Sequence, residues 1–295
     1  MMVKSPFAAL AALTALAGCA TMGQAGAGPA SAQADAARQD GRADPAGART
    51  NERQARTQES SQGREAQRLS AREEHAARER IGREDILTQM TFWAQRYSNT
   101  PDDRDVAEHF AEALRLGGRN DRAAQVAQEA LARFPDNAAL LQTLGSALIA
   151  AGNPNDALRP LALVAHADAR DWKSRVTLGV ALDQLGRTAE ARRAYQEALA
   201  IAPDNPIILT NLGVSHLLAA EPADAETVLR QAAALPNAPM EARQNLALAV
   251  GLQGRFDEAE QLERIDLPPA IVAQNMDFIR GLISDPRSWR DMRRQ

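Results

Sequence analysis

In the middle of the chain, apolar residues recur at the spacing of two amphipathic helices with a short turn between them. Leu178 and Leu182 are four residues apart, and so are Tyr195 and Leu199, which places each pair on one face of a helix. Gly186 lies between the two stretches, where a residue without Cβ tolerates the positive φ that ends a helix. The pattern predicts a helical hairpin whose apolar faces pack against each other.

Small residues and a proline complete the hairpin. Gly179 and Ala191 fall where the two helices would cross, so the backbones can approach closely. Pro203 ends the second helix, because it has no N–H to donate and disfavours helix in the residue before it. Residues 172–205 therefore form one predicted unit of 34 residues.

The same pattern recurs along the chain. Steps of 34 residues from Ala191 always reach alanine, and steps from Gly186 reach glycine except at Ala220. The Leu178-Gly179 column keeps an apolar residue followed by glycine or alanine. Three columns in one phase are not plausibly chance, even in an alanine-rich chain. They define five units without insertion: 104–137, 138–171, 172–205, 206–239 and 240–273.

An amphipathic helix is predicted before these units, in residues 84–103. Ile86, Met90, Trp93 and Tyr97 step by four, three and four residues and so share one face. We interpret this segment as a half unit whose Trp93 and Tyr97 belong to the core and cover the exposed end of the stack; a ligand site is the less favoured alternative.

Another amphipathic helix is predicted after the units. Pro269 can open a helix at its first position. An apolar face follows, formed by Val272, Met276, Ile279 and Ile283. We expect this helix to cap the other end of the stack.

Two units depart from the pattern. Unit four has His216 where the others have leucine or valine, and we interpret it as a satisfied core or edge histidine, with a functional role as the alternative. Unit five has Glu263 and Asp266 where apolar residues are expected, so its second helix should end early, before Pro268.

The unit resembles the tetratricopeptide repeat, a helix–turn–helix of 34 residues. The resemblance implies an all-α fold: a right-handed α-solenoid of five full units with an N-terminal half unit and a C-terminal capping helix. In such solenoids the first helices line a concave groove that commonly holds a peptide or a partner helix.

The resemblance also implies that positions 2, 5, 6, 9, 12 and 13 of each unit face this groove. Eight candidate contacts follow: Lys173, Asp183, Gln184, Asn211, Leu217, Gln244, Asn245 and Leu248. The amides could bond the backbone of a bound segment and the leucines could hold its apolar side chains. The alternative is that the leucines are core and the amides merely solvated. Lys173 stands nearly alone as a base on this face, so a clamp for a terminal carboxylate is not expected.

Composition and motifs argue against several classes of function. The net charge of −4 does not suggest nucleic acid as a partner. The single cysteine excludes an intramolecular disulfide and a cysteine-rich metal site. The four histidines are scattered, and no Gly-rich phosphate loop, HExxH motif or nucleophile elbow is present. We predict a chain that is not an enzyme and that has no catalytic residues, cofactor or metal.

The N-terminus resembles a bacterial lipoprotein leader. Lys4 precedes a short apolar stretch, which ends in Leu16-Ala17-Gly18-Cys19. Residues 1–18 are the predicted signal peptide, and the Cys19 thiol is the predicted site of lipidation. The alternative is an ordinary leader with an incidental cysteine. Ala20 is not aspartate, which favours the outer membrane in enteric-type sorting.

Polar segments flank the solenoid, which we place at residues 84–283. Residues 19–83 include almost no large apolar side chains, so we expect a disordered tether with a span of about 40–45 Å. Residues 284–295 form a basic tail. We favour a solvated end, with contact to an acidic partner or lipid headgroups as the alternative.

The run RQNLALAVGLQGRFDEAE at residues 243–260, followed by Asp266-Leu267-Pro268-Pro269, is similar to the last repeat of the TadD-like lipoproteins. These belong to the tight-adherence (Flp, type IVc) pilus machinery. The resemblance covers roughly residues 85–283 and the leader. It implies a lipid-anchored scaffold on the periplasmic face of the outer membrane, with the pilus secretin or other assembly components as partners. The alternative is a general envelope scaffold that recruits other periplasmic proteins.

Overall fold

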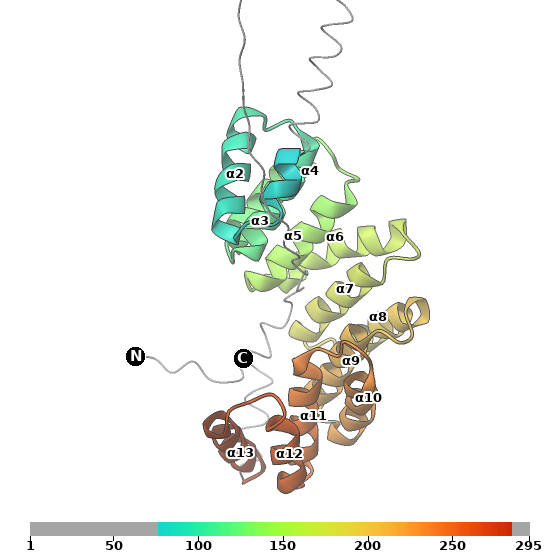
Figure 1. Cartoon of the computed structure of the whole chain (residues 1–295). Helices are drawn as coiled ribbons and strands as arrows, with labels where there is room; N and C mark the ends of the chain where they lie inside the picture. Colours follow the sequence, from blue (N-terminus) through green and yellow to red (C-terminus); the bar gives the residue numbers. More distant parts are fainter. Residues whose placement is uncertain (1–75, 285–295) are drawn as a thin grey trace, which may run out of the picture. The chain divides into compact units, whose positions relative to one another are not determined.

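The computed structural model describes residues 76–284, and this part of the chain is helical (Figure 1). The leader, Cys19, the tether up to residue 75 and the tail from residue 285 lie outside the described residues. Among the described helices, none combines the length and the apolar character needed to cross a bilayer. Among the described residues, 93–284 belong to one compact unit, and residues 76–92 are grouped apart from it.

The helices follow the predicted period. The first helix of each unit begins at the first residue of that unit, so the 34-residue spacing is confirmed. The bounds are α2 (Ile86–Asn99), α3 (Arg104–Leu116), α4 (Asn120–Leu131), α5 (Ala138–Ala150), α6 (Pro154–Ala167), α7 (Trp172–Gln184), α8 (Thr188–Ile201), α9 (Pro206–Leu218), α10 (Pro222–Ala234), α11 (Met240–Leu252), α12 (Phe256–Glu263) and α13 (Pro269–Ser284).

A capping residue fixes where each first helix starts. Asp103, Asn137, Asp171 and Asn205 precede α3, α5, α7 and α9, and each side chain accepts hydrogen bonds from backbone N–H groups two or three residues later. These bonds satisfy donors that the first turn of a helix leaves free. Unit five has Pro239 at this position, without a side-chain cap.

The turn between the two helices of a unit uses a left-handed residue. Gly186 has a φ of +71°, and the equivalent glycines of units one, two and five have φ between 72° and 83°. Unit four places Ala220 there, with a φ of 61°. A Cβ makes this conformation unfavourable, so Ala220 strains the unit-four turn.

The two helices of a middle unit touch at position 8 of the unit. A Cβ on Gly179 would lie 2.4 Å from the ring of Tyr195, at position 24 of the same unit. The same close approach occurs in the pairs Gly145–Leu161 and Gly213–Leu229. Glycine is therefore required here for closeness, and the predicted close crossing is confirmed.

The hairpins stack in sequence order. Each helix from α3 to α12 packs on the next one, and the first helices also contact each other in the series α3, α5, α7, α9, α11, α13. This is the predicted α-solenoid. Trp93, with 2% of its surface exposed, stacks on His109 at a centroid distance of 4.5 Å, which supports the core interpretation of the half unit.

The C-terminal end differs in one detail from the prediction. Helix α12 has 8 residues and ends at Glu263, as expected. In α13, Val272, Met276 and Ile279 are buried, but the fourth buried residue is Leu282, whereas the predicted Ile283 is 42% exposed. A three-residue step from Ile279 keeps the side chain on the packed face.

Candidate protein-binding surface

Two of the eight predicted contacts lie open at the ends of α7. Lys173 and Gln184 are both exposed. Between them, Thr177 and Val180, at positions 6 and 9 of unit three, are half-buried. This helix therefore presents a cation, a hydroxyl, an apolar side chain and an amide along one accessible line.

Helix α9 continues this surface into unit four. Asn211 and Val214 occupy positions 6 and 9 and are half-buried, and Ile207 is 39% exposed at position 2. The Asn211 amide donates to the Ile207 carbonyl of its own helix at 2.8 Å. We call the accessible residues at positions 2, 6, 9 and 13 of α7 and α9 the open face. They are Lys173, Thr177, Val180, Gln184, Ile207, Asn211, Val214 and Leu218.

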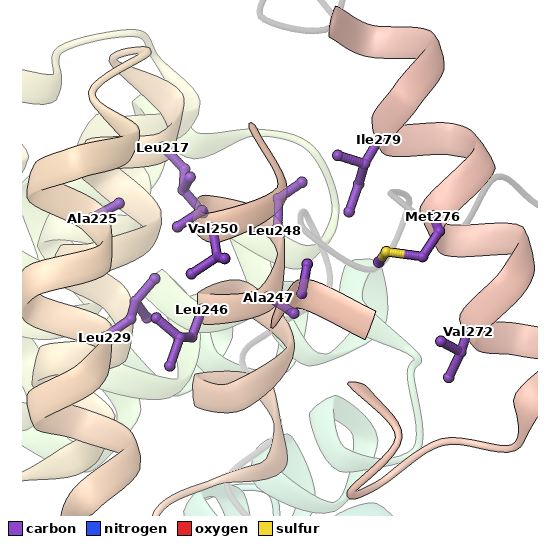
Figure 2. Close-up of a cluster of buried hydrophobic side chains, with 12 residues drawn as sticks. Leu217, Ala225, Leu229, Leu246, Ala247, Leu248, Val250, Val272, Met276 and Ile279 are labelled. Atoms are coloured by element: carbon purple, nitrogen blue, oxygen red, sulfur yellow. The ribbon is translucent and has the colours of Figure 1, made fainter. Parts of the chain in front are cut away.

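The prediction that two leucines contact a partner is wrong for this structure. Leu217 and Leu248 are 1% and 4% exposed and belong to one buried cluster (Figure 2). Their apolar surface is already covered by neighbours within the chain, including Leu229 and Met276. In this structure both are core residues, which is the alternative interpretation.

Asp183 is also an internal group and not a surface contact. Its carboxylate accepts hydrogen bonds from the Tyr195 hydroxyl at 3.0 Å and from the Ser215 hydroxyl at 2.9 Å. Burial raises the pKa of Asp183 to about 6, while these two hydrogen bonds act to lower it. Asp183 thus joins α7, α8 and α9, and its partners come from both helices that it faces.

The two amides of unit five differ in accessibility. Gln244 is half-buried, whereas Asn245 is only 4% exposed. The Asn245 Nδ2 atom is buried and has no hydrogen-bond partner. Asn245 is therefore not an open contact in this structure.

His216 is a satisfied edge histidine, as predicted. Its Nδ1 lies 2.8 Å from the Glu221 carboxylate and 3.3 Å from Nη1 of Arg192. The hydrogen bond with His216, and then the one from Arg192, lower the pKa of Glu221. The sequence alone could not have paired these residues, because Arg192 comes from the preceding unit.

The residue types around His216 would also suit a metal ion. His216, Glu221 and Asp224 bring ligating atoms to within 4.8 Å of one another. However, the Arg192 guanidinium is bonded to the Glu221 carboxylate and contacts the His216 ring. A guanidinium at this place neutralises the carboxylate and repels a cation, so the cluster is best explained as an ion pair between units.

Family models describe the repeats. A model described as tetratricopeptide repeat matches residues 110–176, and one described as TPR repeat matches residues 179–218. These segments include α4 to α6, α8, α9 and all of α7 except residues 177 and 178, and they contain the open face apart from Thr177. No curated protein matches the chain.

The chain is similar to solved structures. The thermophilic TPR protein TTC0263 of Thermus thermophilus is 22% identical, with a TM-score of 0.52 over 60% of this chain and 98% of that chain. The crystal structure of MamA protein is 23% identical, with a TM-score of 0.46 over 55% of this chain and 88% of that chain.

Proposed function

We propose that this tetratricopeptide-repeat protein is a non-catalytic scaffold that binds a partner protein on the open face of α7 and α9. The repeat fold is typical of protein-interaction scaffolds. The open face carries the proposal, because its side chains are accessible while the core beneath is complete. It offers Lys173 and Gln184 at the two ends of α7 and mostly apolar side chains along α9, a combination suited to an amphipathic helix or an extended segment.

We also propose that lipid attached to Cys19 anchors the scaffold in the membrane. The support is the sequence Leu16-Ala17-Gly18-Cys19, in which the thiol is the only strong nucleophile of the leader. More than one acyl chain gives a stable anchor, at roughly 0.8 kcal/mol per buried CH₂. Metabolic labelling with a palmitate analogue tests this: the wild type should take up label and fractionate with the outer membrane, and Cys19→Ser should do neither. A labelled Cys19→Ser protein would contradict the anchor.

The proposed process is assembly of a tight-adherence pilus, with its secretin as partner. The support is the similarity of residues 243–260 and of the leader to the TadD-like lipoproteins. A general envelope scaffold is the alternative, and it predicts a different partner at the same surface.

Site-directed photo-crosslinking in cells distinguishes the two. A benzophenone amino acid at the exposed Gln184 should capture the secretin or another pilus assembly protein. The same probe at Gln196, exposed on α8, is the matched control and should capture neither. Capture of an unrelated envelope protein at position 184 alone would favour the alternative. Equal capture at both positions would contradict binding at the open face.

A further inference from the structure

Helix α13 packs on a part of α11 whose equivalent stays accessible in the two preceding first helices, α7 and α9. Positions 6 and 9 are half-buried in α7 and in α9, but the equivalent residues of α11, Asn245 and Leu248, are buried. Leu248 shares a cluster with Met276 and Ile279 of α13. The C-terminal helix is therefore more than a cap on the last unit, because it covers the continuation of the open face.

The cover is made by an apolar stripe. Val272, Met276 and Ile279 are each at most 2% exposed, and Figure 2 shows Met276 and Ile279 on the side of α13 that faces Ala247 and Leu248. The fit is close, since a Cβ on Gly251 would lie 3.0 Å from Cγ2 of Ile279. The surface of α11 is thus shaped for a helix with apolar residues at positions i, i+4 and i+7.

Two buried polar groups in this region have few or no hydrogen-bond partners. Asn245 carries a buried amide nitrogen without a partner, on the α11 face that includes Leu248. Glu263, 4% exposed, is held by the Asn275 amide of α13, with 3.1 Å from Nδ2 to each carboxylate oxygen. A buried donor left unbonded and a buried carboxylate with an amide as its partner both weaken a folded arrangement.

We propose that α13 is a displaceable occupant of α11, and that the surface beneath it binds an amphipathic helix of a partner protein. That helix has the apolar spacing of Val272, Met276 and Ile279, and it carries a hydrogen-bond acceptor that takes the Asn245 amide. The partner helix displaces α13 because it accepts the hydrogen bond from the Asn245 amide that α13 does not accept.

This inference deepens the proposed scaffold role and rests on it only for the existence of a protein partner. The probe is instead the chain's own helix, so the outcome does not depend on the pilus. Failure of the photo-crosslinking at Gln184 would contradict the proposed partner but not the binding surface on α11. Failure of the peptide to bind would contradict the α11 surface but not the partner.

The test measures binding of a fluorescent peptide of residues 267–284 to the full chain in a Cys19→Ser background. In that parent the tethered α13 competes at an effective concentration on the order of millimolar, so binding should be weak. Met276→Glu places a charge in the covered stripe and should release α13, tightening peptide binding at least tenfold. A peptide carrying the same Met276→Glu change is the matched control and should not bind.

A reversible lock supplies the second variant. Gly251→Cys with Ile279→Cys should form a disulfide across α11 and α13 that blocks the peptide, and reduction of the same sample should restore binding at least tenfold. Equal binding in both states would overturn the proposal. So would a Met276→Glu protein that keeps its helical circular dichroism but ignores the peptide, or one that unfolds, because α13 would then be an indispensable part of the fold.

Discussion

Units two to four and unit five fill the same interior position with different chemistry. In the middle units glycine at position 8 receives a large side chain from position 24, namely Leu161, Tyr195 or Leu229. Unit five has Ala247 and Glu263 at these two positions. The middle units close their own hairpins, whereas unit five depends on a neighbour outside the repeat, α13, to bury its apolar face.

The difference shows how a solenoid can end without exposing its core. A unit in the row is completed by the unit that follows it, so the last one needs another source of apolar surface. Here that source brings a buried carboxylate and an unbonded amide with it. We therefore expect the C-terminal end to be the least stable part of the described chain.

The largest effect on the free energy of unfolding should come from placing a glutamate at position 24 of a middle unit, as unit five has. Leu229→Glu buries a carboxylate against Gly213 and should destabilise the chain by about 4–5 kcal/mol in urea unfolding. Leu163→Glu, at a site that is 50% exposed, is the control and should change the free energy by less than about 0.5 kcal/mol. Similar losses at both sites would remove the distinction between the positions.

Removing the buried charge of unit five by Glu263→Gln should stabilise the chain, by an amount that depends on pH. Burial raises the pKa of Glu263 from 4.5 to about 7. The folded state therefore favours the protonated carboxyl, so its penalty is absent below pH 4.5, grows as the pH rises to 7, and is complete above. Glu263→Gln should be about 3 kcal/mol more stable than the parent at about pH 8 and nearly equal to it at about pH 4.5.

Urea unfolding at several pH values, followed by circular dichroism, measures this difference. Glu260→Gln, on the same helix but paired with Arg264, is the matched control and should show no comparable gain in alkaline buffer. A gain of Glu263→Gln that is the same in acidic and alkaline buffer would show that the carboxyl charge is not the cause.

A smaller effect should follow from adding one methyl group to a middle unit. Gly179→Ala places a Cβ against the Tyr195 ring and should destabilise the chain by about 2 kcal/mol. Gly281→Ala adds the same group to α13, where nothing beyond the local helix backbone lies within 4 Å of the added Cβ, and should stabilise by up to about 1 kcal/mol. Thermal melts of both variants would test whether closeness, and not helix propensity, keeps glycine at position 8.

The smallest effect concerns the turn of unit four. Ala220→Gly should stabilise the chain by about 0.5–1 kcal/mol, because glycine adopts the φ of 61° without strain. Ala219→Gly, at a φ of −80°, should destabilise it by about the same amount. Chemical unfolding of the pair measures the difference, and a loss in both variants would mean that the Ala220 turn is unstrained.

The repeats could be predicted from the sequence because their signals are local. Position 8, the turn and the second-helix alanine each constrain one hairpin, and the helices begin where these columns place them. The half unit and the early end of α12 also follow from spacing. Each of these rests on residues whose role is set within one helix or by the adjoining turn.

The candidate surface was harder to predict, because exposure depends on what packs above a residue. The groove positions implied by the repeat family are the same in every unit, so they ignore what packs on each unit. Leu248 and Asn245 are buried in the one unit that α13 covers, and Asp183 turns inward because Tyr195 and Ser215 supply hydroxyl donors. None of these pairings lies within a single helix, so periodicity could not reveal them.

The shared cap at the start of each first helix bears on how such a chain changes its length. Asn137, Asp171 and Asn205 stand at equivalent junctions and start the next helix in the same way. A gene segment duplicated between two such junctions would therefore bring its own start signal, and its ends would match existing seams. The junction at Pro239 lacks this cap, so we expect lineages to gain or lose repeats ahead of unit five and to keep the C-terminal pair of α11 and α13 intact.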